Sequence, residues 1–161
     1  MLFKEELNTK AGEIKQYIAV NASVAFKSIL PYITTAERDY IKPLLGNDQY
    51  TELCSYYQSP STWDPEEGQA EAEDLANLLP LVQQALINLA YWKGYPALSV
   101  NIGDGGAFRI EKEHEKSLFQ YQEENLRNSF KNEGFNTLDK ILEFLEENID
   151  KFPCFSASAT Y

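Results

Sequence analysis

The feature that most constrains the fold is a long apolar segment near the middle of the chain, residues 78–93. Apolar side chains recur there every three or four residues, at Leu79, Val82, Leu86, Leu89 and Ala90. This is the period of an α-helix, and further apolar residues widen the stripe beyond one face. The polar edge is narrow and consists of Gln83, Gln84, Asn88 and Lys93. A helix this apolar has to be surrounded, so we predict that it is central and that the other segments pack against it.

Helical periodicity continues on both sides of this segment. It predicts helices from about residue 21 with a kink or restart at Pro31, then over 35–45, 49–58, 66–77, 113–131 and about 137–152. Gly46, Gly94 and Gly134 are expected to end helices, because glycine readily adopts the left-handed conformation of helix C-termini. Pro80 marks either the first turn of the central helix or a kink in a longer one. Residues 14–20 predict a short strand or an extended arm.

The best strand signal lies at residues 98–111. Two alternating segments, 98–102 and 107–111, flank Gly103-Asp104-Gly105-Gly106, which is typical of a β-turn. We therefore predict a mostly α, single-domain helical bundle around the central helix, with one β-hairpin at about 98–111. The domain spans residues 1–161, and its ends, about 1–12 and 154–161, are expected to be flexible.

The charge balance argues against nucleic-acid binding. The chain has 14 Lys and Arg against 25 Asp and Glu, a net charge of −11, whereas neutralising phosphates requires basic side chains. We predict no sequence-specific nucleic-acid contact. No apolar run approaches the roughly 20 residues of a membrane span, and the first residues lack the apolar stretch of a secretory signal. These patterns favour the cytoplasm, or an assembly made there, and no membrane contact.

No residue predicts catalysis or cofactor binding. His114 is the one histidine and stands between two glutamates on a polar segment, which favours a solvated side chain. Cys54 and Cys154 lie far apart without metal-ligand spacing, and we expect no disulfide between them. The glycines at 103–106 are not followed by the lysine of a phosphate-binding loop. We expect no enzyme, no cofactor and no metal.

An acidic block runs from Asp64 to Asp74 and contains no basic residue. A solvated face is the usual explanation of such a run. A metal site is the sharper alternative, although Glu71 and Glu73 would point to different sides of a helix. A further alternative is an acid-dependent hydrolase that uses Glu66, Glu67, Glu71 or Asp74. Trp63 precedes the block and, if exposed, is a candidate anchor for a protein partner.

A set of residues spread over nearly the whole chain forms a recurring pattern. It comprises Ala36-Glu37, the run Tyr40-Ile41-Lys42-Pro43-Leu44-Leu45-Gly46, Tyr50, Leu53, Ala85, Ala90, Phe108-Arg109-Ile110, Gly134-Phe135, Leu138, Leu142, Phe144 and Leu145. This order resembles that of small helical proteins from Bacteroides-type bacteria and their phages and prophages. It is also similar to the head–tail connector proteins of tailed phages. This chain departs from the simplest connectors in its acidic insertion, 59–74, and its additional final helix.

The connector resemblance implies a non-enzymatic structural protein that forms a ring at the portal. Its partners would be further copies of itself, the portal, and tail or neck proteins, in the host cytoplasm and in the virion. An acidic lumen would let DNA pass without adhering, and the hairpin would act as an arm toward a neighbour. The residues expected to contact a subunit or partner are Trp63, Val100, Ile102, Phe108, Arg109 and Ile110. The alternative is a cytoplasmic helical binding or regulatory protein that is not part of a virion.

Overall fold

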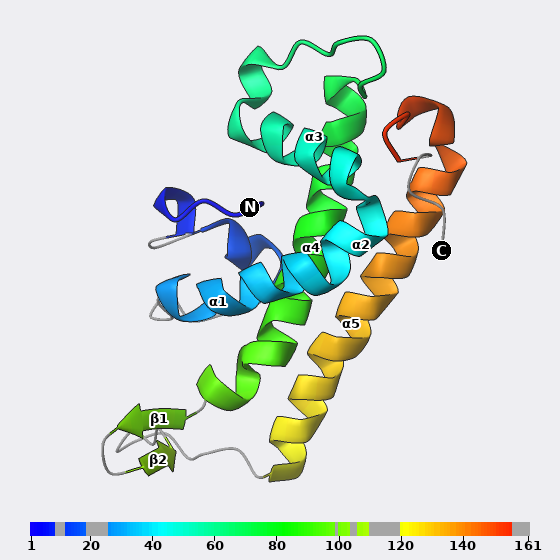
Figure 1. The fold of residues 1–161 in the computed structure, drawn as a ribbon. Helices are drawn as coiled ribbons and strands as arrows, with labels where there is room; N and C mark the ends of the chain where they lie inside the picture. Colours follow the sequence, from blue (N-terminus) through cyan, green and yellow to red (C-terminus); the bar gives the residue numbers. More distant parts are fainter. Residues whose placement is uncertain (9–11, 19–25, 99, 104–105, 110–119, 156–161) are drawn as a thin grey trace.

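Two long helices dominate the structure, α4 (Ala72–Leu98) and α5 (Gln120–Glu147), which lie side by side (Figure 1). Helix α1 (Phe26–Ala36) packs across α4, and α3 (Asn47–Gln58) lies toward one end. The computed structural model describes residues 1–8, 12–18, 26–98, 100–103, 106–109 and 120–155, and around the strands it describes the backbone alone. The described residues are mostly helical, which confirms the mostly α character of the predicted fold. Among them, no helix combines the length and the apolarity that crossing a membrane requires.

Helix α4 contains the predicted central segment and extends it in both directions. Its residues from Ala85 to Ala90 are all buried, as the apolar stripe predicts. The predicted end near Gly94 is wrong, because the helix continues through Pro96 to Leu98. Both of its internal prolines are exposed, so the ring of each can face solvent while the apolar face stays packed. Tertiary packing here outweighs the hydrogen bond that each proline removes.

The predicted polar edge of α4 is partly buried. Gln83 is only 4% exposed, and its amide is bonded at both ends. Its Nε2 donates to the carbonyl of Leu2 at 2.7 Å, and its Oε1 accepts from the hydroxyl of Tyr17 at 2.8 Å. Asn88 is also buried, and its Nδ2 donates to the carbonyl of Gln84 at 2.9 Å. These bonds satisfy polar groups that burial would otherwise penalise.

The first residues of the chain pack into the core instead of lying loose as predicted. Leu2 and Phe3 are fully buried, and the amide of Leu2 donates to Oε1 of Glu37 at 2.8 Å. The amide of Lys4 donates to the hydroxyl of Tyr57 at 3.1 Å. A strand or arm was predicted from residue 14, but short 3₁₀-helices form instead at η1 (Glu6–Asn8) and η2 (Glu13–Gln16). The two apolar residues at positions 2 and 3 explain why this end is held.

Helix α1 leads through a π-helical turn, η3 (Glu37–Ile41), into the short helix α2 (Lys42–Leu45). The prediction that Gly46 ends this region is confirmed, since its φ is 78° and α3 begins at the next residue. The connection from α3 to α4 contains the 3₁₀-turn η4 (Pro60–Thr62) and is otherwise irregular. The acidic helix predicted from Glu66 is therefore wrong at its start, because α4 begins only at Ala72.

Helix α5 passes through Gly134 without a break, so the predicted pair of helices separated there is wrong. A Cβ at Gly134 would lie 2.7 Å from Cδ2 of Leu89 on α4. The glycine thus permits a close approach of the two helices and does not end one. After α5 come the 3₁₀-turn η5 (Ile149–Lys151) and the buried side chains of Phe152 and Phe155.

Two short strands follow α4, β1 (Val100–Gly103) and β2 (Gly106–Arg109). They pair antiparallel, with Val100 opposite Arg109 and Gly103 opposite Gly106. Figure 1 draws this pair beyond the last turn of α4, away from α3. Residues 104–105 and 110–111 of the predicted hairpin lie outside the described residues, so a hairpin over its full predicted length stays a prediction.

Candidate functional site

Three aromatic rings from three elements meet at the surface where η3, α4 and α5 come together. The ring of Tyr40 lies 6.4 Å from that of Trp92 and 5.7 Å from that of Phe135, and the last two are 5.9 Å apart. These centroid distances are typical of favourable aromatic pairs. Tyr40 and Trp92 are half-buried, whereas Phe135 is 37% exposed. The cluster is therefore partly open to solvent.

The π-helical turn η3 carries Tyr40 into this cluster. Within it, the backbone amide of Lys42 donates to the carbonyl of Glu37, five residues earlier. Pro43 follows directly and has no amide to continue the ordinary ladder, and its ring would clash with the carbonyl four residues before it. A wider turn relieves this clash. Single π-turns of this kind are frequent at functional sites.

Cationic side chains surround the three rings. Arg127, Lys131 and Phe135 stand one helical turn apart on α5 and so share one edge of that helix. Arg127 Nε donates to the carbonyl of Trp92 at 3.4 Å, and Lys131 Nζ lies 5.6 Å from the centroid of the Trp92 ring. Lys93 Nζ lies 5.0 Å from the centroid of the Tyr40 ring. These are cation–π distances.

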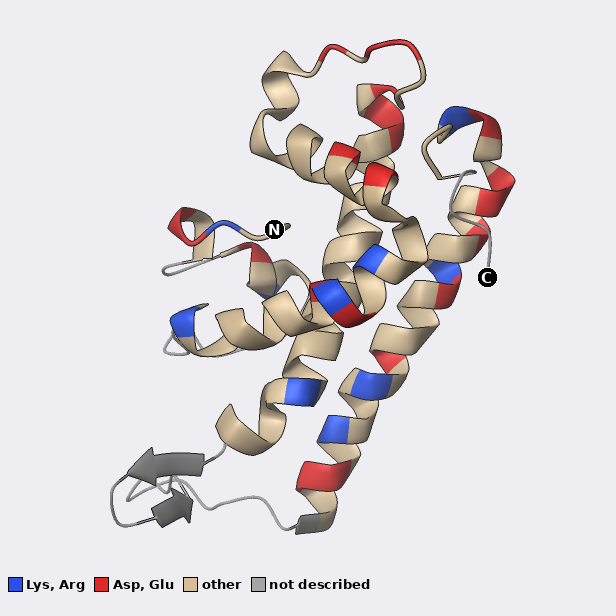
Figure 2. Cartoon of the chain, in the orientation of Figure 1, with Lys and Arg blue, Asp and Glu red and all other residues tan. Residues whose placement is uncertain are grey.

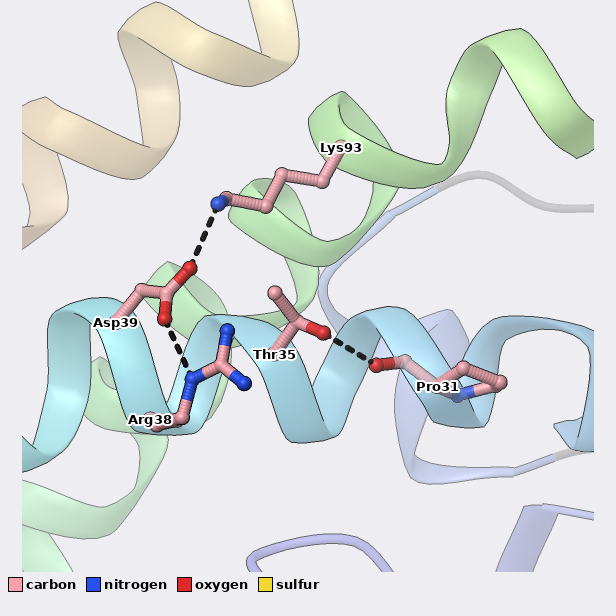
Figure 3. A network of polar contacts seen from close by, with 5 residues as sticks. All are labelled: Pro31, Thr35, Arg38, Asp39 and Lys93. Atoms are coloured by element: carbon pink, nitrogen blue, oxygen red, sulfur yellow. Dashed lines mark hydrogen bonds and ion pairs between the residues drawn. The ribbon is translucent and has the colours of Figure 1, made fainter.

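A carboxylate joins two of the cations at the edge of the cluster. Asp39 accepts a hydrogen bond from Arg38 Nε at 2.8 Å and one from Lys93 Nζ at 2.9 Å (Figure 3). The bond from Arg38, together with that from Lys93, lowers the pKa of Asp39 to about 2. The Arg38 side chain is 71% exposed, so its guanidinium remains accessible. We call the set Arg38, Tyr40, Trp92, Lys93, Arg127, Lys131 and Phe135 the aromatic–cation face.

The charges of the chain are unevenly distributed. Figure 2 shows acidic residues gathered at one end, on the loop between α3 and α4, the start of α4 and the last turns of α5. Basic residues occur on α4 and α5 farther along, where the aromatic–cation face lies. The face has four cations, and Asp39 lies beside two of them. On α5 the edge that carries Arg127 and Lys131 also carries Glu123 and Asp139, one turn before Arg127 and one turn after Phe135. In a protein with a net charge of −11, this surface thus groups exposed cations with aromatic rings.

A pocket of about 360 Å³ lies at the acidic end. Its lining comes from α3, from the loop that follows and from the end of the chain: Asn47, Asp48, Thr51, Glu52, Ser55, Trp63, Gln69 and Cys154. Glu52 is only 5% exposed and accepts hydrogen bonds from the amide of Ala70 at 2.6 Å and from Nε2 of Gln49 at 2.7 Å. Burial raises the pKa of Glu52, although both bonds oppose the shift. Glu52 therefore fastens the loop to α3.

Trp63 forms one wall of this pocket. Its ring is half-buried and meets Tyr56 edge-on, with centroids 5.9 Å apart. Its Nε1 donates to the carbonyl of Ala70 at 3.2 Å. The Trp63 side chain is thus held by contacts within the protein, and only part of its ring is accessible to solvent. The role of partner anchor was predicted on the condition that this side chain is exposed. That role stays a prediction.

The other residues singled out in the sequence occupy separate places. Val100 and Ile102 lie on β1, and Phe108 and Arg109 lie on β2, while Ile110 and His114 are outside the described residues. Their contact with a neighbour stays a prediction. In the acidic block, Glu66, Glu67 and Glu71 are exposed, and Asp74 is paired with Lys151 at 3.1 Å. No group of three or more metal-binding side chains occurs in the described part of the chain. Both cysteines are free thiols.

Sequence reasoning missed the aromatic–cation face, because its three rings are 43 to 95 positions apart in the sequence and meet only in the folded chain: Tyr40, Trp92 and Phe135. The sequence placed Tyr40 only within a predicted helix, and it did not connect the cations around the rings with it. The one available signal was the spacing of Arg127, Lys131 and Phe135 along a single helix edge.

The protein is thus a mostly α-helical protein with a partly exposed aromatic–cation face. Residues 41–161, well over half of the chain, match a family described as a family of unknown function, DUF6712, and the chain belongs to this family. No curated protein and no solved structure matches it. The matched region begins directly after Tyr40 and includes the α4 and α5 contributions to the face.

Proposed function

We propose that the protein is a non-enzymatic structural subunit of a phage or prophage, a head–tail connector or adaptor that forms a ring at the portal. The observation that carries the proposal is the aromatic–cation face. Trp, Tyr, Phe and Arg are enriched at protein–protein interfaces, and Trp, Tyr and Arg dominate their hot spots. Here Phe135 is 37% exposed among four cations. Such a surface suits a subunit that assembles with other proteins.

The connector role itself comes from the sequence resemblance, and two further features are compatible with it. The strands β1 and β2 follow the end of α4 and would serve as an arm toward a neighbouring subunit or the portal. In this proposal the arm contacts its neighbour through Val100, Ile102, Phe108, Arg109 and Ile110. Trp63 contacts a tail or neck protein through the part of its ring that faces the pocket.

The negative charge of the chain suits a passage for DNA. A net charge of −11 repels the phosphate backbone, so DNA would move through a ring of such subunits without adhering. The proposal includes no cofactor, no catalytic residue and no sequence-specific contact with bases. The protein would occur in the host cytoplasm before assembly and in the virion afterwards.

A genetic experiment tests the connector role in its natural setting. The gene would be deleted from the phage or prophage, and the particles produced would be examined by electron microscopy. We expect separate DNA-filled heads and separate tails, since no other subunit would join them. Restoring the gene on a plasmid should restore joined particles. Normal joined particles in the deletion strain would exclude the proposal.

The pocket favours a second candidate function, that of a cytoplasmic helical binding or regulatory protein outside any virion. A volume of about 360 Å³ with a tryptophan wall is within the range of small-ligand sites. This candidate predicts that genes for metabolism or regulation flank the gene. Neighbouring genes for a portal, a capsid protein or tail components would count against it.

A further inference from the structure

We propose that the aromatic–cation face of one copy docks on the acidic loop of a second copy, residues 64–73, in a head-to-tail contact. This inference rests on the proposed ring-forming function and names the two surfaces that the ring would use. It follows from the charges, exposure and positions of the two surfaces.

The acidic loop is exposed and carries charge of one sign. Its five exposed carboxylates belong to Asp64, Glu66, Glu67, Glu71 and Glu73. No Lys, Arg or His lies between residues 64 and 74. On the aromatic–cation face, Arg38, Arg127 and Lys131 are exposed, and Asp39 is paired with both Arg38 and Lys93. The exposed cations Arg127 and Lys131 are therefore opposite in sign to the carboxylates of the loop, and such pairs favour and orient association.

The acidic loop is also held in one shape. The carbonyl of Ala70 accepts from Trp63 Nε1 at 3.2 Å, and the amide of Ala70 donates to the buried Glu52 at 2.6 Å. Within the loop, the amide of Glu66 donates to Oε1 of Gln69 at 2.9 Å. A segment ordered in advance loses less conformational entropy when it binds. These bonds hold the backbone of the loop at Glu66 and Ala70.

The positions of the two surfaces determine the kind of assembly. Figure 2 shows the acidic loop at one end of the molecule, whereas the basic residues of α4 and α5 lie farther along these helices. A contact between two different surfaces is heterologous, so each copy can bind one neighbour through its face and another through its loop. Such contacts generate rings when the rotation closes. The exposed Phe135 would supply the apolar part of each contact.

Two charge-reversal variants of the full chain test this contact. The face variant is R127E/K131E, and the loop variant is E66K/E67K. All four side chains are exposed, so each variant should fold, which circular dichroism and the melting temperature would verify. The matched controls are K140E on α5 and E143K/E146K, at exposed positions outside both surfaces. Sedimentation velocity at low and high salt would measure self-association.

We expect wild-type self-association to weaken with salt, as contacts between exposed charges do. Each reversed variant alone should associate at least about tenfold more weakly, because close charge pairs contribute strongly to binding. An equimolar mixture of the two variants should recover association, since the loop of the face variant matches the face of the loop variant. The control variants should behave like wild type.

Three results would overturn the docking proposal. They are a wild-type chain that stays monomeric at low salt and about millimolar concentration, variants that associate like wild type, and a mixture that recovers nothing. Face variants that instead lose retention on single-stranded DNA would assign the face to nucleic acid and overturn docking as well.

Binding of the wild-type chain to the portal protein, measured in parallel, separates the docking proposal from the connector role. Portal binding without the charge dependence overturns only the docking contact, and charge-dependent association without portal binding overturns only the connector role.

Discussion

Gly134 lies where α5 comes closest to Leu89 of α4. A Cβ at this position would lie 2.7 Å from Cδ2 of Leu89, 2.8 Å from its Cγ and 3.4 Å from its backbone nitrogen. Leu89 is fully buried, so any movement of its side chain would have to be accommodated within the core. The spacing of the two longest helices thus depends on the absence of a side chain at one residue.

We predict that G134A destabilises the protein. Alanine would favour the helix by about 1 kcal/mol, but forcing a methyl group into a packed contact costs about 1–3 kcal/mol or more. The free energy of unfolding, measured in urea, should fall. The matched control is G94A, whose added Cβ meets the half-buried ring of Tyr32 at 2.7 Å. That ring can move, so G94A should cost less. Equal or greater stability of G134A than wild type would contradict this explanation.

Glu52 gives the stability a dependence on pH. Burial raises its pKa in the folded state above the usual value of 4.5. Between these two pKa values the folded chain binds more protons than the unfolded chain, so the contribution of Glu52 to stability falls as pH rises. Below the unfolded value, this contribution is fully present. This pH dependence arises from ionisation of the Glu52 carboxyl group, so it should be absent when the side chain cannot ionise.

We therefore predict that E52Q removes this part of the pH dependence. Its amide oxygen can still accept from Ala70, but the side chain cannot ionise. The difference in the free energy of unfolding, wild type minus E52Q, should decrease from pH 4 to 8. The exposed Glu73, changed to Gln, is the control for replacing a carboxylate by an amide. A difference that stays constant or increases for E52Q would show that burial does not raise this pKa.

Gln83 connects the first residues of the chain to helix α4. Its side chain bonds both the carbonyl of Leu2 and the hydroxyl of Tyr17, and it is 4% exposed. Burial of Leu2 and Phe3 adds apolar contacts to the same region. The N-terminal segment is therefore part of the packing around α4, and its loss should weaken the whole helix bundle.

The variant Q83L tests this connection. Leucine fits a buried position but leaves two polar groups without their partner, which costs about 1–3 kcal/mol. We expect a correspondingly lower free energy of unfolding and faster proteolysis near the N-terminus. The control Q84L removes a half-buried amide bonded to Glu133, which water can replace, and should cost less. If Q83L were as stable as Q84L, the Gln83 bonds would not hold this segment.

The elements differ in how far the sequence determines them. Helix α4 was predictable because its apolar period is long and regular, and Gly46 was correctly predicted as a helix end. Gly134 and Gly94 were misread as helix ends, because the local propensity for a break was outweighed by packing in the fold. The burial of Leu2 and Phe3 depends on contacts with distant residues, which periodicity does not report. The π-turn η3 likewise has no periodic signature.

The candidate site was less predictable than the fold. The proposed contact residues on the strands were predicted from the local alternation of apolar and polar side chains. Such alternation predicts a strand, but it does not show which partner the strand contacts. Trp63 was recognised as unusual, but its bond to Ala70 and its contact with Tyr56 depend on the fold of the loop. The aromatic–cation face combines residues of η3, α4 and α5. Only the three-dimensional packing brings such residues together.

Charge and surface chemistry are separated along the long helices of the protein. The acidic end carries the pocket and the fixed loop, and the aromatic–cation face lies farther along α4 and α5. A chain with two different and complementary surfaces can bind a neighbour on each side. This arrangement suits a subunit of a closed assembly. In the proposed function, such an assembly would form on the portal protein.

Binding to the portal protein encoded by the same genome tests the connector role most directly. The two proteins would be purified separately and mixed, and the mass of the complex would be determined by native mass spectrometry. The connector role predicts a complex in which several copies of this chain occupy one portal ring. The face variant R127E/K131E should bind in fewer copies, because neighbouring subunits would no longer support each other. A mixture in which portal and chain keep their separate masses at all concentrations would contradict the connector role.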